Sequence, residues 1–294
     1  MRPVLLSACR TPIGKFLGGL SALAAPDLGA IVIREAVQRA GLLPTHIDEV
    51  IMGNVLSAGV GQAPARQAAL RAGLPPEVAA FTINKMCGSG LKAVMLAAQA
   101  VKAGDANAIV AGGMESMSQA PHLLAATRTG WKIGDRTVVD SMQYDGLHCA
   151  MEDRPMGGLA EDTARTRDIS RVDQDDFSRT SHRRACQAAE SGDFAEEIIP
   201  VMAPSKRGTE RIALDEGIRS GVTPEDLARL NPNSEVKKHR FVRKAVAERG
   251  CNTKSNLNPR TKQCIQSFTR FSVPAKFNSV ARPRQSPRSG DWSA

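Results

Sequence analysis

The stretch Ala79-Ala80-Phe81-Thr82-Ile83-Asn84-Lys85-Met86-Cys87-Gly88-Ser89-Gly90 decides the fold of this 294-residue chain. Its first five residues predict a short buried strand. After Cys87, apolar residues recur at helical spacing up to Gly104, a typical helix end; they are Leu91, Val94, Met95, Ala98 and Val101. The sequence therefore places Cys87 at the junction between a strand and a helix.

A cysteine at such a junction has the surroundings of a reactive thiolate. A free thiol is only a few per cent ionised at pH 7, and a helix N-terminus stabilises the anion by about 0.3 to 2 kcal/mol. Acyl transfer would need a base or further donors as well. The alternative interpretation of Cys87 is a small buried hydrophobic residue. Two hydrolase patterns are excluded, because a nucleophile elbow needs glycine where Lys85 stands and the papain-type pattern fails at Gly90.

Strands and helices alternate along the first 118 residues. We expect strands at 4–8, 49–55, 79–83 and 106–112, and helices at 27–40, 62–71 and after Cys87. This order predicts an α/β fold with a mostly parallel sheet that carries helices on both faces.

Further motifs are distributed along residues 1–232. In chain order they are Arg10 to Phe16, Asn84 to Gly90, Ala111 to Ser118, Tyr144 to Leu147, Met156-Gly157, Ser181-His182 with Ala185, Asp215-Glu216 with Ile218-Arg219, and Thr223 to Leu227. Together they resemble the N-terminal part of a thiolase, the family that makes or cleaves 3-ketoacyl-CoA through an acyl-cysteine intermediate. The resemblance implies a thiolase-like α/β domain over 1–118 and a loop domain covering coenzyme A over 119–232.

The resemblance also implies roles for individual residues. Cys87 would be the nucleophile, and its backbone N–H would form part of an oxyanion hole. Leu147 and Met156 match positions lining the pantetheine tunnel, and Arg219 matches one near the nucleotide end; ordinary loop packing is the alternative for Leu147 and Met156. A coenzyme A thioester would be the substrate, and no separate cofactor or metal is implied.

The last 62 residues differ in composition. Residues 233–294 hold 14 of the 39 Lys and Arg but 3 of the 30 Asp and Glu, so the formal charge of +9 comes from this tail. Few of its residues are large and apolar, which predicts a disordered, basic tail unrelated to thiolases. A nucleic-acid-binding arm is a second interpretation, because clustered Lys and Arg neutralise phosphates; we do not expect it.

The resemblance stops at about Pro232, where thiolases continue into a second half. We expect that this half is absent, through a reading-frame change or a similar event. Its Gly-His-Pro histidine has no match among the histidines of this chain, which are His46, His122, His148, His182 and His239. Cys251 and Cys264 lack the following glycines of its second cysteine.

The sequence therefore predicts an acyltransferase of thiolase type, catalysing Claisen condensation or thiolysis in pathways such as fatty acid metabolism, and catalytically impaired by truncation. The alternative is a non-catalytic thiolase remnant or binding protein. We expect a cytoplasmic protein with no membrane segment and with acyl-CoA as its partner. We also expect association of copies through the N-terminal half, and an apolar face of Leu91, Met95 and Ala98 exposed by loss of the second half.

Overall fold

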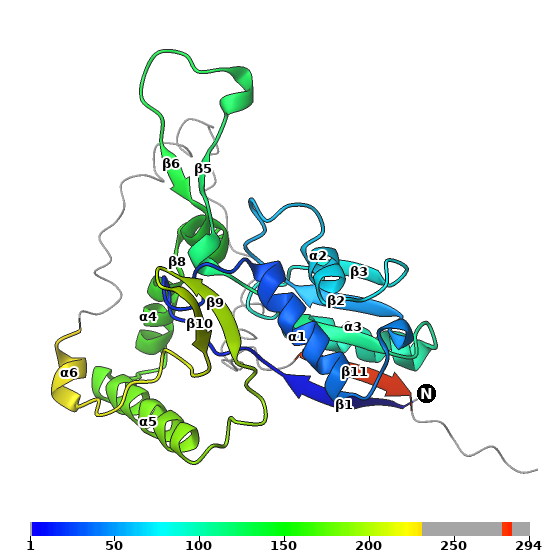
Figure 1. Ribbon diagram of the computed structural model, residues 1–294. Helices are drawn as coiled ribbons and strands as arrows, with labels where there is room; N and C mark the ends of the chain where they lie inside the picture. Colours follow the sequence, from blue (N-terminus) through cyan, green and yellow to red (C-terminus); the bar gives the residue numbers. More distant parts are fainter. Residues whose placement is uncertain (1, 231–277, 284–294) are drawn as a thin grey trace, which may run out of the picture.

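The centre of the protein is a five-stranded sheet (Figure 1). The computed structural model describes residues 2–230 and 278–283. The strands follow the order β1-β11-β4-β2-β3, with bounds Pro3–Cys9 for β1, Glu49–Gly53 for β2, Ala79–Ile83 for β3, Ile109–Gly113 for β4 and Asn278–Pro283 for β11. β2 is parallel to β3 and β4, whereas β11 is antiparallel to both of its neighbours. The α/β fold with a mostly parallel sheet is confirmed.

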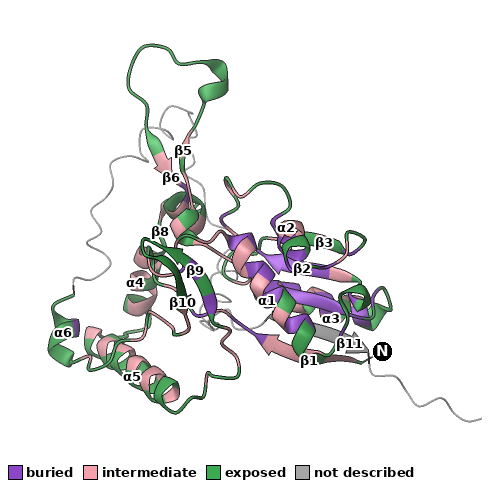
Figure 2. Cartoon of the chain, viewed as in Figure 1, coloured by how far each residue is buried: buried purple, intermediate pink, exposed green. Residues whose placement is uncertain are grey.

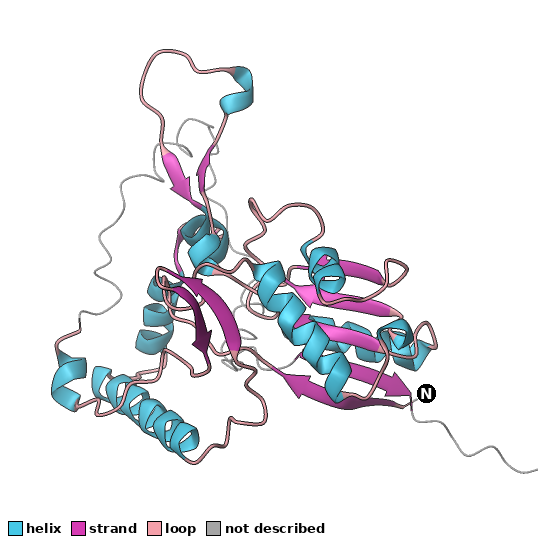
Figure 3. Cartoon of the chain, in the orientation of Figure 1, coloured by secondary structure: helices cyan, strands magenta, loops and turns pink. Residues whose placement is uncertain are grey.

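Helices cover both faces of this sheet (Figure 3). Side chains alternate along β2, because successive residues of a strand point to opposite faces. Val50 and Met52 lie in one buried cluster with α1 (Ala25–Arg39) and α2 (Pro64–Arg71). Ile51 lies in a second cluster with α3 (Ser89–Ala103). Strands buried on both faces, as Figure 2 shows for β2 and β4, are typical of parallel sheets.

The predicted elements of this part are confirmed, with small shifts at their ends. β3 matches its predicted range residue for residue. α3 ends at Gly104, whose φ of +90° is the left-handed conformation that glycine adopts readily at helix C-termini. Glycine allows close packing at the end of β4, because a Cβ on Gly113 would lie 3.3 Å from the Gly90 Cα.

Residues 114–230 form smaller elements beside the sheet. Their strands pair as three hairpins: β5 (His122–Leu124) with β6 (Val138–Asp140), β7 (His148–Cys149) with β8 (Arg154–Pro155), and β9 (Val201–Ser205) with β10 (Gly208–Ile212). The helical elements are η4 (Met142–Leu147), α4 (Met156–Thr166), α5 (Arg171–Glu190) and α6 (Pro224–Ala228), with short 3-10 turns at Met117–Gln119 and Thr127–Thr129. A further 3-10 turn, Pro44–His46, lies between α1 and β2. Among the described helices, none is long and apolar enough to cross a membrane. The predicted domain boundaries at 118 and 232 stay predictions.

One strand of the sheet comes from the basic tail. β11 lies between β1 and β4 and pairs through its backbone with both, for example Val280 with Ser7 and with Val110. Residues 278–283 are the part of the tail that the structure describes, and they form this strand. Composition alone could not reveal this strand, because backbone N–H and C=O groups make the pairing. The rest of the tail, with His239, Cys251 and Cys264, lies outside the described residues.

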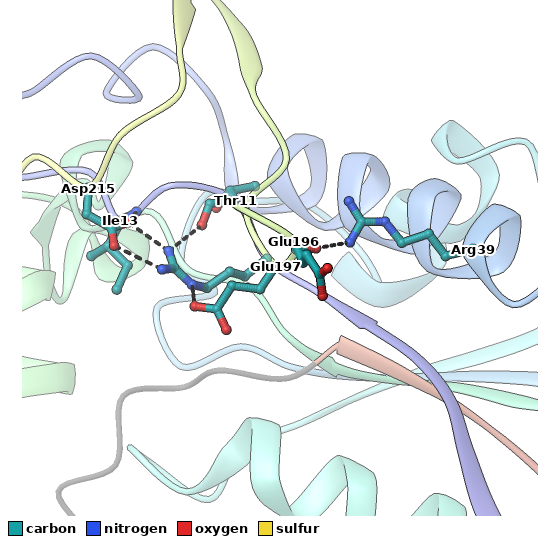
Figure 4. Close-up of polar contacts among 7 residues, drawn as sticks. Thr11, Ile13, Arg39, Glu196, Glu197 and Asp215 are labelled. Carbon is teal, nitrogen blue, oxygen red and sulfur yellow. Dashed lines mark hydrogen bonds and ion pairs between the residues drawn. The ribbon is translucent and has the colours of Figure 1, made fainter. Parts of the chain in front are cut away.

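An ion-pair cluster fastens residues 194–216 to the end of β1 (Figure 4). The Arg10 side chain is 6% exposed and pairs with Asp215 at 2.7 and 2.9 Å and with Glu197 at 2.7 Å. Burial alone would lower the pKa of Arg10, but its two carboxylate partners outweigh burial and raise it, so the guanidinium stays charged. The next carboxylate, Glu216, accepts hydrogen bonds from the backbone N–H groups of Lys15 and Gly19.

Candidate active site

The candidate nucleophile lies where the sequence placed it. Cys87 is exposed, follows β3 by four residues and precedes Gly88, the N-cap of α3. The structure gives its backbone N–H no hydrogen-bond partner among the described residues. Cys87 is therefore not a buried hydrophobic residue of the core.

Glycines allow the N-terminus of α3 to lie directly on the sheet. A Cβ on Gly53, the last residue of β2, would lie 2.6 Å from the Ser89 Cβ and 2.8 Å from the Gly90 nitrogen. A Cβ on Gly90 would lie 3.5 Å from the Gly113 nitrogen at the end of β4. Any side chain at Gly53 would push the helix outward, so these contacts fix the height of Cys87 above the sheet.

The backbone around Cys87 is held by two neighbouring side chains. Met86 has φ +49°, a left-handed conformation that is uncommon for a residue with a side chain. The Met86 N–H donates to Asn84 Oδ1 at 2.9 Å. The buried Ser89 hydroxyl accepts from the Lys85 N–H at 2.8 Å and donates to the Met86 carbonyl at 2.6 Å.

A second network joins the strand ends beneath this junction. Asn54, buried just after β2, donates from Nδ2 to Glu115 Oε1 at 2.7 Å and to the Met114 carbonyl at 3.2 Å. The Glu115 carboxylate also accepts from the N–H groups of Val55 and Leu56. Burial raises the pKa of Glu115, although the two backbone donors act in the opposite direction. We call Asn54 and Glu115 the strand-end network.

Sequence reasoning gave no role to Ser89, Asn54 or Glu115. The sequence signal was a polar residue close after an apolar strand: Asn54 directly follows β2, and Glu115 lies two residues after β4. That pattern marks the carboxyl edge of a parallel sheet, where polar groups gather and ligands bind in open α/β folds. The partners themselves lie about sixty positions apart in the chain, so their pairing could not be inferred.

The other described cysteines differ from Cys87. Cys9 is 1% exposed, and its Sγ donates to the Val32 carbonyl at 3.4 Å. Burial raises the pKa of the Cys9 thiol to about 11. Cys149 and Cys186 are half-buried. Cys9 thus stays a neutral thiol at physiological pH, and Cys87 is the exposed cysteine within the described ranges.

The described histidines make contacts away from Cys87. His46 Nδ1 accepts from the Leu43 N–H, and His182 Nδ1 accepts from the Arg219 N–H at 3.3 Å. His148 Nε2 lies 3.0 Å from Asp153 Oδ1, and its ring stacks on Tyr144. His122 is an exposed residue of β5. Within residues 2–230 no group of three or more His, Cys, Asp or Glu is placed to hold a metal ion.

The residues matched to coenzyme A binding fall into two places. Leu147 and Met156 flank the β7–β8 hairpin, and because His148 pairs with Pro155, the two meet at its open end. Leu147 is half-buried and Met156 is exposed. Arg219 is exposed in the segment after β10, where its carbonyl accepts from the Cys186 thiol at 3.5 Å. No described hydrogen bond joins any of these residues to Cys87.

The outer face of α3 carries uncovered apolar side chains. Leu91 is 59% exposed and Met95 is 47% exposed, as expected for a helix without a covering layer. Ala98 is half-buried, so the prediction that it would be exposed was too strong; its small side chain is partly shielded by the helix itself. The face begins one turn after Cys87.

The comparisons with known proteins agree with this geometry. Residues 3–237 match the family model described as thiolase, N-terminal domain, and the chain therefore belongs to the thiolase family. It is 50% identical over 230 residues to the acetyl-CoA acetyltransferase of Cupriavidus necator, and this match covers 78% of this chain and 58% of that protein. It is 49% identical over 230 residues to a probable acetyl-CoA acetyltransferase of Mycolicibacterium smegmatis, covering 78% and 59% of the two chains.

A solved structure supports the same assignment. The crystal structure of the Acat5 thiolase from Ascaris suum in complex with coenzyme A matches with a TM-score of 0.73 and 38% identity. The match covers 79% of this chain and 58% of that one. The chain thus spans somewhat under three fifths of the length of these relatives.

Proposed function

We propose that this chain is an acyltransferase of the thiolase type that accepts the acyl group of an acyl-CoA on Cys87. The single observation that carries the proposal is the exposed Cys87 thiol directly before the N-cap of α3. The names of the relatives, acetyl-CoA acetyltransferases, support acetyl-CoA as the donor.

The proposed step is a thioester exchange. The Cys87 thiolate attacks the carbonyl carbon of the acyl-CoA, and the negative charge moves to the carbonyl oxygen. The N–H of Cys87, for which the described residues provide no acceptor, is one donor for this oxyanion, and such a donor contributes about 10² to 10³ in rate. The bond to the coenzyme A sulfur then breaks, and that sulfur takes up the proton that the cysteine lost. The products are acyl-Cys87 and free coenzyme A, with no separate cofactor required.

The second half of the reaction requires groups that we do not find in the described part of the chain. Claisen condensation needs a base to remove an α-proton from a second acyl-CoA, which contributes about 10² to 10⁴ in rate. The described histidines have other contacts and lie on other elements. We therefore expect acylation of Cys87 without steady turnover by this chain alone.

Coenzyme A binding by Leu147, Met156 and Arg219 is part of the same proposal. The position of Leu147 and Met156 at one end of the β7–β8 hairpin supports a shared apolar surface for a flexible thioester arm. The exposed guanidinium of Arg219 is suited to a phosphate group. We also propose that copies associate through the N-terminal half, which the uncovered Leu91 and Met95 favour. A cytoplasmic location stays a prediction.

The test is to mix the purified chain with acetyl-CoA and acetoacetyl-CoA, and to follow each cysteine by peptide mass spectrometry while coenzyme A release is measured. We expect about one acyl group per chain on Cys87, none with Cys87→Ala, and unchanged acylation with the matched variant Cys186→Ser. Absence of acylation would overturn the proposal. Continuous coenzyme A release would refute the expectation of a stalled cycle.

The alternative function, binding without chemistry, is favoured by the lack of a placed base among residues 2–230. It predicts that coenzyme A binds with equal affinity to wild type and to Cys87→Ala, and that no acyl-enzyme forms. Formation of acyl-Cys87 separates the two functions, and equilibrium dialysis with labelled coenzyme A shows whether a chain that is not acylated still binds the coenzyme.

A further inference from the structure

The backbone immediately before Cys87 is held in a conformation that its own sequence disfavours. Met86 has φ +49°, and the Cβ of a non-glycine residue crowds the backbone there. Such a residue persists only when its surroundings fix it. The conformation matters because it sets the direction in which the next residue, Cys87, leaves the turn.

Ser89 supplies most of that constraint. Its hydroxyl accepts from the Lys85 N–H and donates to the Met86 carbonyl, so one oxygen bridges the peptide groups on both sides of the strained residue. Ser89 is 4% exposed, and its Cβ lies against Gly53. The hydroxyl cannot turn toward solvent and is fixed relative to the sheet.

Asn84 adds a weaker hold from the other side. Its Oδ1 accepts from the Met86 N–H at 2.9 Å, but the residue itself is exposed. With Lys85 N–H, Met86 N–H and the Met86 carbonyl all occupied, the Cys87 N–H is left without a partner in the described residues.

We propose that Ser89 is a positioning residue for acylation: its hydroxyl locks Met86 in the left-handed conformation and so presents the Cys87 thiol and N–H together to the thioester. This inference rests on the proposed function. Ser89 is buried beneath the turn and does not touch the substrate, so it acts through the backbone. Loss of the hydroxyl would let Met86 relax and would misplace Cys87.

The main variant is Ser89→Ala, which removes the hydroxyl and keeps the Cβ that contacts Gly53. The matched control is Ser141→Ala, because Ser141 is equally buried and donates to the Pro121 carbonyl at 2.5 Å in another part of the chain. Two rates are measured for each: acylation of Cys87 by acetyl-CoA, and alkylation of Cys87 by iodoacetamide between about pH 6 and about pH 10.

We expect Ser89→Ala to slow acylation about tenfold to a hundredfold and to alter the pH profile of alkylation, with Ser141→Ala leaving both unchanged. If Ser89 only stabilised the fold, the folded Ser89→Ala protein would keep the wild-type pH profile of Cys87 alkylation and the wild-type rate of Cys87 acylation. Equal rates and profiles for Ser89→Ala and wild type would overturn the inference, as would an equal loss in Ser141→Ala.

Two further variants test the inference: Met86→Gly tests whether Ser89 acts through Met86, and Asn84→Ala replaces Ser89→Ala if that variant does not fold. In a Met86→Gly background the left-handed conformation costs little, so removing Ser89 should slow acylation clearly less than it does in the wild-type background. An undiminished effect there would contradict the proposed route. If Ser89→Ala does not fold, the exposed Asn84→Ala replaces it and should show a smaller loss of the same kind; no loss would overturn the inference.

The proposed function and this inference fail differently. A wild-type chain that is never acylated removes the function, and the alkylation profile then still decides whether Ser89 positions the thiol. A wild-type chain that is acylated, with a Ser89→Ala variant indistinguishable from it, removes the inference alone.

Discussion

The sheet part of the molecule and residues 119–190 are built by different means. The sheet has two buried clusters, one on each face, composed of Ala, Val, Ile and Met from β2, β4 and the helices. In 119–190, α4 and α5 contain no buried residue (Figure 2). Large side chains such as Phe177 and Ile133 are exposed. The first part can hold its shape through its own core, whereas the second depends on hydrogen bonds, ion pairs and attachment to its neighbours.

The difference locates the chemistry. Cys87 and the strand-end network belong to the sheet part, where the backbone is fixed by packing. Leu147 and Met156 belong to the loosely packed part. The proposed nucleophile thus lies in a rigid part and the proposed coenzyme A residues in an adaptable one, an arrangement common in enzymes, whose functional loops are carried by a rigid scaffold.

The largest expected effect comes from breaking the attachment of residues 194–216, which follow the second part in the chain, to the sheet part. Arg10→Met leaves Asp215 and Glu197 without their buried partner, which typically costs about 3 to 5 kcal/mol. Hydrogen exchange should show faster opening of β9, β10 and the following segment, with β2 and β4 still protected. An equal loss of protection in β2, β4, β9 and β10 would contradict the claim that the sheet part holds its shape through its own core.

A matched surface variant serves as the control for that experiment. Arg71 pairs with Asp27 at 2.8 Å on an exposed part of the molecule. Arg71→Met should change the free energy of unfolding by about 0 to 1 kcal/mol, because exposed ion pairs contribute little. A similar loss in both variants would mean that burial of Arg10 is not what matters.

A smaller effect tests whether the site really belongs to the sheet. Gly53→Ala inserts a methyl group against Ser89 and Gly90, and overpacking of this kind costs about 1 to 3 kcal/mol. Urea unfolding measures the loss, and slower acylation of Cys87 should accompany it. Gly217→Ala, where a Cβ meets nothing within 4 Å, is the control. Normal acylation in a folded Gly53→Ala protein would contradict the claim that packing of α3 on the sheet sets the position of Cys87.

The smallest effect concerns pH. Burial raises the pKa of Glu115 above its ordinary value of 4.5, so the folded state holds this proton more tightly than the unfolded chain does. The contribution of this proton to stability is complete below about pH 4.5 and is lost as pH rises through the raised value. Relative to Glu115→Gln, the wild type should therefore lose stability between those limits, measured by urea unfolding at several pH values. An opposite slope would show that the donors from Val55 and Leu56 outweigh burial.

Much of the sheet part was predictable because its signals are local. Apolar runs predicted the strands, and Gly104 predicted the end of α3. The place of Cys87 followed from the same signals. Ser89 was missed because its buried hydrogen bonds depend on the turn at Met86, which no sequence pattern reported. The strand-end network was missed because its partners come from different strands. The roles of Leu147, Met156 and Arg219 stay predictions.

The strand order has a consequence for how the molecule is made. β1 is synthesised before the other strands of the sheet, yet its Pro3 pairs with Pro283, 280 residues further along the chain. Until β11 has been synthesised, the inner edges of β1 and β4 present unpaired backbone groups, and such edges attract other extended chains. Closure of the sheet therefore waits until residues 278–283 have been synthesised, and such pairing between distant segments favours slow folding.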